Sequence, residues 1–131
     1  MNDNPHSPGR GWPEKFRDAF RGVKVGVRGQ SSFFAHFFFA AAVVGAGVVL
    51  RVTQSEWCML VLCMAVVLAA EMFNTALESM ARAITEETHP DLGDALDIGS
   101  AAVLLAAVGA VVVGLIIFGN RLAILLGWWS G

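Results

Sequence analysis

Hydrophobic residues gather in three long runs, which cover residues 33–50, 57–70 and 101–118. The second run is shorter than the others, but its helical pattern continues through the segment EMFNTALE to residue 78. A helix needs about 20 mainly apolar residues to cross a hydrocarbon core of roughly 30 Å. The pattern therefore predicts three transmembrane helices, over about 32–50, 57–78 and 98–118.

The segment before these runs has a different pattern. Between Pro13 and Arg28, apolar residues recur at helical spacing and basic residues cover much of the remaining surface. This is typical of an amphipathic helix that lies in the membrane interface, here over about 13–29, and the alternative is a solvated surface helix on a soluble core. Residues 1–12 are polar, contain prolines and glycines, and are expected to form a mobile tail, which leaves 13–131 as one membrane domain. The apolar stripe consists of Phe16, Phe20, Val23 and Val27.

Composition agrees with an all-α integral membrane protein. Of the 131 residues 56% are hydrophobic and only 15% are charged, and the mean hydropathy is +0.62. A formal net charge of −2 gives no overall basic field, which argues against nucleic acid as a partner. The two cysteines, Cys58 and Cys63, lie within one apolar run, so we expect no disulfide and no zinc site.

The distribution of basic residues predicts the orientation in the membrane. Cytoplasmic segments carry an excess of lysine and arginine. Seven basic residues precede the first run or lie between the second and third, and two lie on the other side. We therefore expect the N-terminus and the 79–97 loop to be cytoplasmic. The seven are Arg10, Lys15, Arg17, Arg21, Lys24, Arg28 and Arg82, and the two are Arg51 and Arg121.

Polar residues interrupt the second run on one helix face. Glu71, Asn74 and Glu78 are spaced i, i+3 and i+7, and Glu71 lies about 21 Å along the helix from Trp57. Acidic groups inside a span are costly, so they indicate a functional site near the cytoplasmic boundary. The deeper Glu71 suits a general base and the shallower Glu78 suits a hard cation. The alternative is that these residues only form hydrogen bonds between helices.

Further acidic residues surround His89 and Pro90 between the second and third runs. Taken alone, this cluster is typical of a solvated loop with a helix N-cap at Asp91. Asp97, four residues before the third run, is the member expected to face the same site as Glu78. His36 has two interpretations: it is a ligand, or it makes a contact between helices. The second interpretation is favoured. The sequence contains neither a phosphate-binding G-x-x-x-x-G-K-[ST] loop nor a G-x-G-x-x-G motif.

Three motifs resemble the prokaryotic diacylglycerol kinase family, which includes undecaprenol kinases. They are the run EMFNTALE from Glu71, the segment from Glu87 to Pro90, and the segment DIGSAA from Asp97; KFRDAFRG from Lys15 is similar to the family's opening motif. The resemblance implies a homotrimeric bundle in the bacterial cytoplasmic membrane, with active sites shared between subunits. It also implies transfer of the γ-phosphoryl group of ATP, with Mg²⁺, to a lipid hydroxyl, with diacylglycerol as the acceptor that we expect and undecaprenol as the alternative.

The resemblance also implies roles for individual residues. Glu71 would take the proton from the lipid hydroxyl, Asn74 would orient nearby groups, and Glu78 would bind the metal. The nucleotide site would be lined by Glu87, His89 and Asp97, with Lys15 or Arg17 reaching phosphate.

Two positions depart from the family pattern. Gln30 stands where the family usually has a metal-binding glutamate, and Leu96 stands where it usually has a lysine. A neutral amide oxygen can still bind Mg²⁺ but contributes less charge, and leucine cannot neutralise a phosphate. These departures keep open a further alternative, a non-catalytic membrane subunit with the same fold. The intact face of Glu71, Asn74 and Glu78 argues against that alternative.

Overall fold

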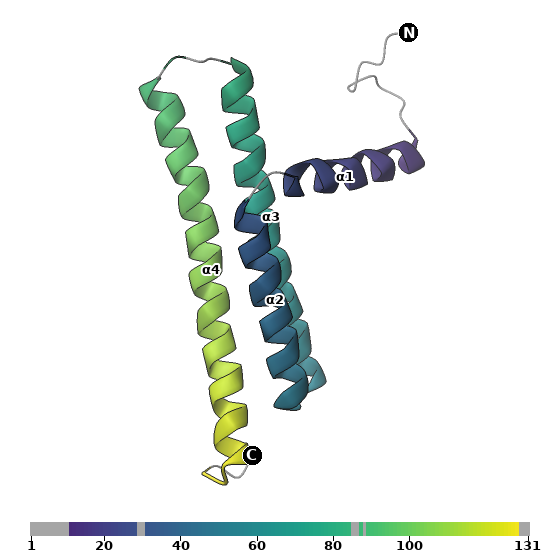
Figure 1. The fold of residues 1–131 in the computed structure, drawn as a ribbon, viewed down its shortest axis with the longest axis vertical. Helices are drawn as coiled ribbons and strands as arrows, with labels where there is room; N and C mark the ends of the chain where they lie inside the picture. The colour runs from purple at the N-terminus through teal and green to yellow at the C-terminus, as the bar shows by residue number, and fades with distance from the viewer. Residues whose placement is uncertain (1–10, 29–30, 85–86, 88, 129–131) are drawn as a thin grey trace. The chain divides into compact units, whose positions relative to one another are not determined.

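The computed structural model describes residues 11–28, 31–84, 87 and 89–128. These residues form four helices: α1 (Trp12–Val27), α2 (Ser31–Val49), α3 (Gln54–Ile84) and α4 (Pro90–Leu125). The chain divides into two units, residues 1–30 with α1 and residues 31–131 with α2, α3 and α4 (Figure 1). The all-α prediction is therefore confirmed for the described residues.

Helix α1 begins one residue before the predicted start and ends two residues before the predicted end. Pro13 lies in its first turn, where the missing N–H costs no intrahelical hydrogen bond. The side chains of Trp12, Phe16 and Phe20 are exposed, and Lys15 Nζ lies 5.0 Å from the centre of the Trp12 ring. The predicted helix is thus present, and its place at a membrane interface stays a prediction.

In the second unit, α3 and α4 run antiparallel and pack along each other, and α2 lies against the same pair (Figure 1). The connection between the second and third predicted spans, residues 79–97, is helical for most of its length, because α3 continues to Ile84 and α4 begins at Pro90. No proline interrupts the segment after residue 78, and Pro90 at the first turn of α4 is a favourable start. At its other end α4 continues through Arg121, and Gly127 adopts a left-handed φ of 73° just after the helix.

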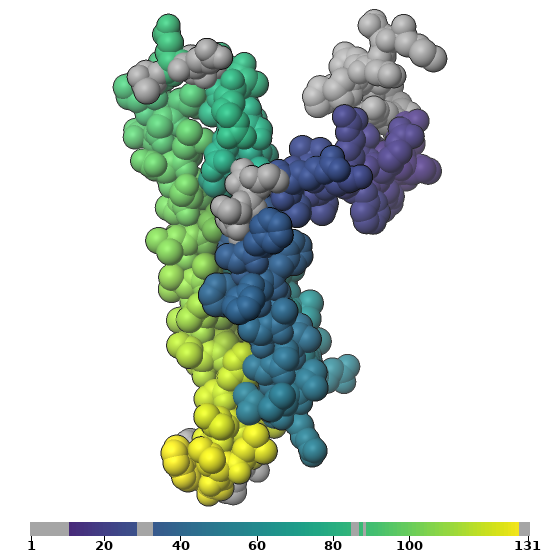
Figure 2. Space-filling view, viewed as in Figure 1, coloured from purple at the N-terminus to yellow at the C-terminus, as the bar shows by residue number. Residues whose placement is uncertain are grey.

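Two of the described helices, α3 and α4, are long and apolar enough to cross a membrane. The described apolar part of α2, Phe33–Val49, is shorter, so the third span stays a prediction. Much of the apolar surface of α4 is uncovered along the face shown in Figure 2. Leu104, Leu105 and Leu115 are among its exposed side chains. An exposed apolar surface of this kind marks a site of contact with a membrane or with another protein.

A cluster of charged and polar contacts joins the start of α3 to the last turns of α4. Thr53 donates its N–H and its Oγ1–H to Glu56 Oε2, at 2.6 and 2.9 Å, and Glu56 N–H donates to Thr53 Oγ1 at 3.4 Å. This reciprocal pair is a capping box. Arg121 donates from Nε to the same carboxylate oxygen at 2.8 Å, and its Nη2 lies 2.7 Å from that oxygen in an ion pair. The Glu56 and Arg121 side chains are only 18% and 21% exposed, so the pair is largely shielded from water.

Beside this cluster lies the small hydrophobic core of the unit. Val52, Leu60 and Ile117 are buried, with Trp57 packed against them. Gly47 of α2 makes room for that indole, because a Cβ there would come within 2.6 Å of the Trp57 ring. All three helices therefore meet at this end, which fixes how far α3 and α4 can slide along each other.

We predict that Glu56→Ala lowers the stability of the folded protein by about 1.5–3 kcal/mol, because it removes charge-assisted hydrogen bonds. Thermal unfolding in detergent micelles measures the change. Ser55→Ala is the matched control, since Ser55 is exposed and lies next to Glu56. Arg121→Ala should cost much less in the Glu56→Ala background than in the wild type. Equal costs in the two backgrounds would show that the ion pair contributes nothing.

Candidate functional site

The polar face of α3 is buried in the described chain. Glu71 is 6% exposed and Asn74 is 9% exposed, and Thr75 beside them is also buried. Residues three and four positions apart lie on the same face of a helix, and this face is turned inward here. The prediction that Glu71 and Asn74 share one face is confirmed, and that face is covered rather than open to lipid.

A chain of polar contacts leads from Asn74 toward the exposed end of α3. Asn74 Nδ2 donates to Glu78 Oε1 at 3.0 Å, and Glu78 Oε2 lies 3.9 Å from Arg82 Nη1. Arg82 Nη2 also donates to Ser79 Oγ at 3.2 Å. The Glu78 side chain is about one-third exposed and Arg82 is mostly exposed. The polar contacts therefore run from the buried Asn74 amide to the Glu78 carboxylate, which water-soluble groups can reach.

The other end of the Asn74 amide faces α4. Asn74 Oδ1 is buried and has no hydrogen-bond partner among the described residues. Gly99 of α4 lies directly opposite, since a Cβ on Gly99 would come within 2.6 Å of this oxygen. Ser100, in the same segment, donates to the Leu96 carbonyl of its own helix at 3.1 Å. The close approach of α4 to the polar face thus depends on Gly99.

His36 of α2 lies beside the deeper carboxylate. Its Nε2 atom is 3.7 Å from Glu71 Oε2, which is within ion-pair range if the imidazole is protonated but too long for a direct hydrogen bond. Phe33 of the same helix is buried and its ring meets the His36 ring edge-on, at 6.4 Å between centres. His36 therefore makes a helix contact, the more favoured of its two sequence interpretations.

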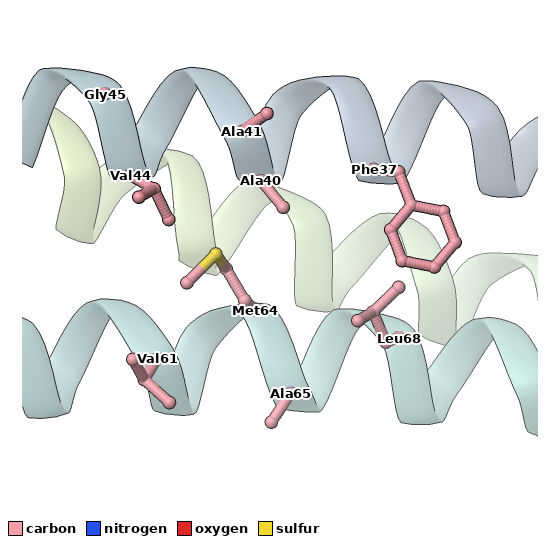
Figure 3. A pocket seen from close by; sticks show the side chains of 9 residues that line it. All are labelled: Phe37, Ala40, Ala41, Val44, Gly45, Val61, Met64, Ala65 and Leu68. Atoms are coloured by element: carbon pink, nitrogen blue, oxygen red, sulfur yellow. The ribbon is translucent and has the colours of Figure 1, made fainter.

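An apolar groove of about 770 Å³ lies between α2 and α3 (Figure 3). Its end nearest the polar face is marked by Phe37 and Leu68, where the phenyl ring points toward the leucine side chain (Figure 3). Phe37 follows His36 directly, and Leu68 is three residues before Glu71. The groove therefore lies within one helical turn of His36 and Glu71 along the two helices, and neither of these two residues lines it. Its lining consists of Phe37, Ala40, Ala41, Val44, Gly45, Val61, Met64, Ala65 and Leu68.

The remaining predicted residues are not gathered around Glu71 within the second unit. Glu87, His89 and Asp97 are all exposed. Asp97 precedes Gly99 by two residues, so it lies about 200° around α4 from the residue that faces Asn74. The expectation that Asp97 faces the same site as Glu78 stays a prediction.

The residues at the start of α4 differ from expectation in one respect. His89, not Asp91, is the N-cap residue, because Pro90 already has helical geometry. Asp91 lies in the first helical turn, 3.9 Å from His89 Nδ1, where its charge still suits the helix dipole.

The sites predicted in and after α1 belong to the first unit. Lys15 and Arg17 are exposed on α1, which belongs to the first unit. Gln30 lies outside the described residues. These three assignments therefore stay predictions.

Oxygen donors dominate the part of the site that could hold a metal. Glu78 offers a carboxylate, a hard ligand that suits Mg²⁺, whereas the Asn74 oxygen is turned toward Gly99 and away from this carboxylate. Among the residues that the structure describes, no group of three or more His, Cys, Asp or Glu side chains could hold a metal ion. This is compatible with Mg²⁺, which usually takes one or two protein carboxylates and completes its shell with water and substrate phosphates.

Comparison with known proteins places the chain in a family. The model of the prokaryotic diacylglycerol kinase family matches residues 17–118, which include α2, α3 and the polar face. The chain belongs to the prokaryotic diacylglycerol kinase family. This confirms the resemblance carried by the sequence motifs. Of the predicted site residues that the structure describes, only Lys15 lies outside the matched region.

Three relatives in the kinase family illustrate the range of acceptors. The chain is 36% identical over 100 residues to a diacylglycerol kinase of Synechocystis, a match that covers 76% of this chain and 57% of that protein. It is 31% identical over 105 residues to the undecaprenol kinase of Bacillus subtilis, covering 80% of this chain and 85% of the relative. A diacylglycerol kinase of Haemophilus influenzae is 29% identical over 102 residues, covering 76% and 86% respectively.

Sequence reasoning gave no role to two residues of this kinase-family chain. Gly99 lies within a quoted motif, but only the fold shows that it faces Asn74. The pairing of Glu56 with Arg121 was not predicted. The role of Glu56 in a capping box could have been, because Thr53-x-x-Glu56 is the sequence signature of that motif.

Proposed function

We propose that the chain is an ATP- and Mg²⁺-dependent lipid kinase that phosphorylates diacylglycerol to phosphatidic acid at the cytoplasmic side of the membrane. One observation carries this proposal: a buried carboxylate, Glu71, lies one helical turn from the bonded Asn74–Glu78 pair, on the helix that also lines an apolar groove through Leu68. An apolar tail in the groove would bring a lipid hydroxyl toward the carboxylate. Family membership supports the same chemistry.

Glu71 acts as the general base. A carboxylate accepts the proton of the lipid hydroxyl while the hydroxyl oxygen bonds to the γ-phosphorus of ATP and the bond to the ADP oxygen breaks. The products are the phosphorylated lipid and ADP. His36, 3.7 Å away, contributes to the field around this carboxylate and keeps α2 next to it.

Glu78 would hold the Mg²⁺ ion, with Asn74 fixing the position of its carboxylate, and the family resemblance assigns Gln30 to the same ion. The ion would neutralise the charge of the phosphates. Such neutralisation dominates the catalysis of phosphoryl transfer. Glu78 suits this role because it is partly exposed and still held by the amide of Asn74. The positive side chains of Lys15 and Arg17 are assigned to the phosphates of the nucleotide.

The membrane arrangement follows the hydrophobic pattern. Helices α2, α3 and α4 span the cytoplasmic membrane, α1 lies in its inner interface, and the N-terminus is cytoplasmic. In the homotrimer that the family resemblance implies, the exposed residues Glu87, His89 and Asp97 would complete the site at the partly exposed Glu78 of a neighbouring subunit. The exposed apolar side of α4 offers surface for such contacts.

The identity of the acceptor is tested by offering two lipids. The purified protein in mixed micelles receives labelled ATP, Mg²⁺ and either diacylglycerol or undecaprenol. We expect label in phosphatidic acid. The match to an undecaprenol kinase over 85% of that protein makes undecaprenol the second candidate. Label in neither lipid would contradict the kinase proposal and favour a non-catalytic subunit.

In this assay we predict that Glu71→Gln lowers kcat by about 10²- to 10⁴-fold, the usual contribution of a general base. The amide keeps the shape of the side chain but cannot accept the proton. Glu14→Gln, the same change at an exposed position of α1, should leave kcat unchanged. Size-exclusion chromatography should give the same oligomer for both variants. Near-normal turnover of Glu71→Gln would remove Glu71 from the role of base.

We predict that Gln30→Glu lowers the Mg²⁺ concentration needed for half-maximal activity. A carboxylate adds negative charge to the ligand set and binds a hard cation more tightly than an amide does. Titration with Mg²⁺ at fixed ATP measures the shift, and Gln54→Glu is the matched control at an exposed position of α3. An unchanged or weaker Mg²⁺ dependence in Gln30→Glu would exclude Gln30 as a ligand.

A further inference from the structure

Gly99 occupies the one described position on α4 where an added Cβ would meet the polar face of α3. Such a Cβ would lie 2.6 Å from Asn74 Oδ1, a distance at which one of the two groups must move, and 3.1 Å from Leu77 Cδ1. At Gly93 and Gly109 of the same helix, an added Cβ would find no described atom within 4 Å. Close approach is therefore a property of this position and not of glycine in α4 generally.

The Asn74 amide is held from both ends. Its Nδ2 group donates to Glu78 Oε1 at 3.0 Å, and its oxygen lies against Gly99. If the amide turned over, its oxygen would face the Glu78 carboxylate oxygen, which repels it because neither atom carries a proton to share. The side chain is short and 9% exposed, so it cannot adjust by swinging into solvent.

We propose that Gly99 is a positioning residue: by lacking a side chain, it lets α4 hold the Asn74 amide in the orientation that directs Nδ2 to Glu78. The inference rests on the proposed function, because it assigns Glu78 to metal binding. An alanine at position 99 displaces the Asn74 amide, which is the movable group at the contact, and the hydrogen bond to Glu78 is lost. Gly99 acts through Asn74 and touches neither substrate nor metal.

The first test observes the amide without using activity. The chain has four asparagines, at positions 2, 4, 74 and 120, so ¹⁵N-asparagine labelling gives few side-chain NMR signals. The Asn74 amide protons should exchange with water more slowly than those of Asn120, which is exposed. Gly99→Ala should shift the Asn74 signals and speed their exchange, and Gly93→Ala should do neither. Equal exchange of Asn74 and Asn120 in the wild type would overturn the inference without any variant.

The second test measures catalysis. Gly99→Ala should lower kcat by about 10- to 100-fold, the scale expected from a small misplacement in an active site, and raise the Mg²⁺ requirement while the lipid KM is unchanged. In an Asn74→Ala background, Gly99→Ala should cost little more, because the group it displaces is absent. If Leu77→Ala instead restores the kcat of the Gly99→Ala variant, the alanine at position 99 acts through Leu77 and the inference is wrong.

The two tests separate this inference from the proposed function. If Gly99→Ala shifts the Asn74 signals while the wild type phosphorylates no lipid, the placement of the amide stands and the kinase proposal is refuted. An active wild type in which Gly99→Ala behaves like Gly93→Ala would leave the kinase intact and refute the role of Gly99.

Discussion

The antiparallel register of α3 and α4 is the constraint on which the second unit depends. Lipid supplies no hydrophobic force between helices, so polar contacts and close backbone approach must hold them. Here these contacts lie at two places on the pair. Near one end, Arg121 and the Thr53–Glu56 capping box fix the axial position; toward the other, the lack of a side chain at Gly99 fixes how closely the helices meet. A slip along the helix axes would break the ion pair and move Asn74 off the glycine.

This register explains why acidic groups are tolerated in α3. Glu71 faces α2 and its histidine, while Glu78 is bonded to Asn74 and near Arg82. Each carboxylate therefore has a polar neighbour, as buried charge requires. The remaining motif residues, Glu87, His89 and Asp97, are exposed, and the proposed function assigns them to a site shared between subunits.

Much of this was predictable because hydrophobic periodicity and helix geometry act locally. The run of 18 apolar residues in α4 and the spacing of Glu71 and Asn74 indicate a helix and a common face without tertiary information. Partners on other helices do not follow from spacing. The pairing of Glu56 with Arg121, 65 residues apart, depends on the register of the folded pair, as does the contact of Gly99 with Asn74. The ends of α3 and α4 that extend beyond the predicted spans were not predicted, because the length of an apolar run reflects membrane thickness and not the length of the helix.

Cysteine accessibility tests most directly the claim that α3 carries its polar face to the cytoplasmic boundary of a membrane. Cys58 and Cys63 are replaced by serine, and single cysteines are placed at Gln54 and at Asp91, both exposed positions at opposite ends of the α3–α4 pair. A membrane-impermeant maleimide should label Gln54→Cys on intact spheroplasts and label Asp91→Cys only after lysis. Labelling of Asp91→Cys on intact spheroplasts, with protection of Gln54→Cys, would put the acidic face on the wrong side of the membrane for ATP and contradict the proposed kinase.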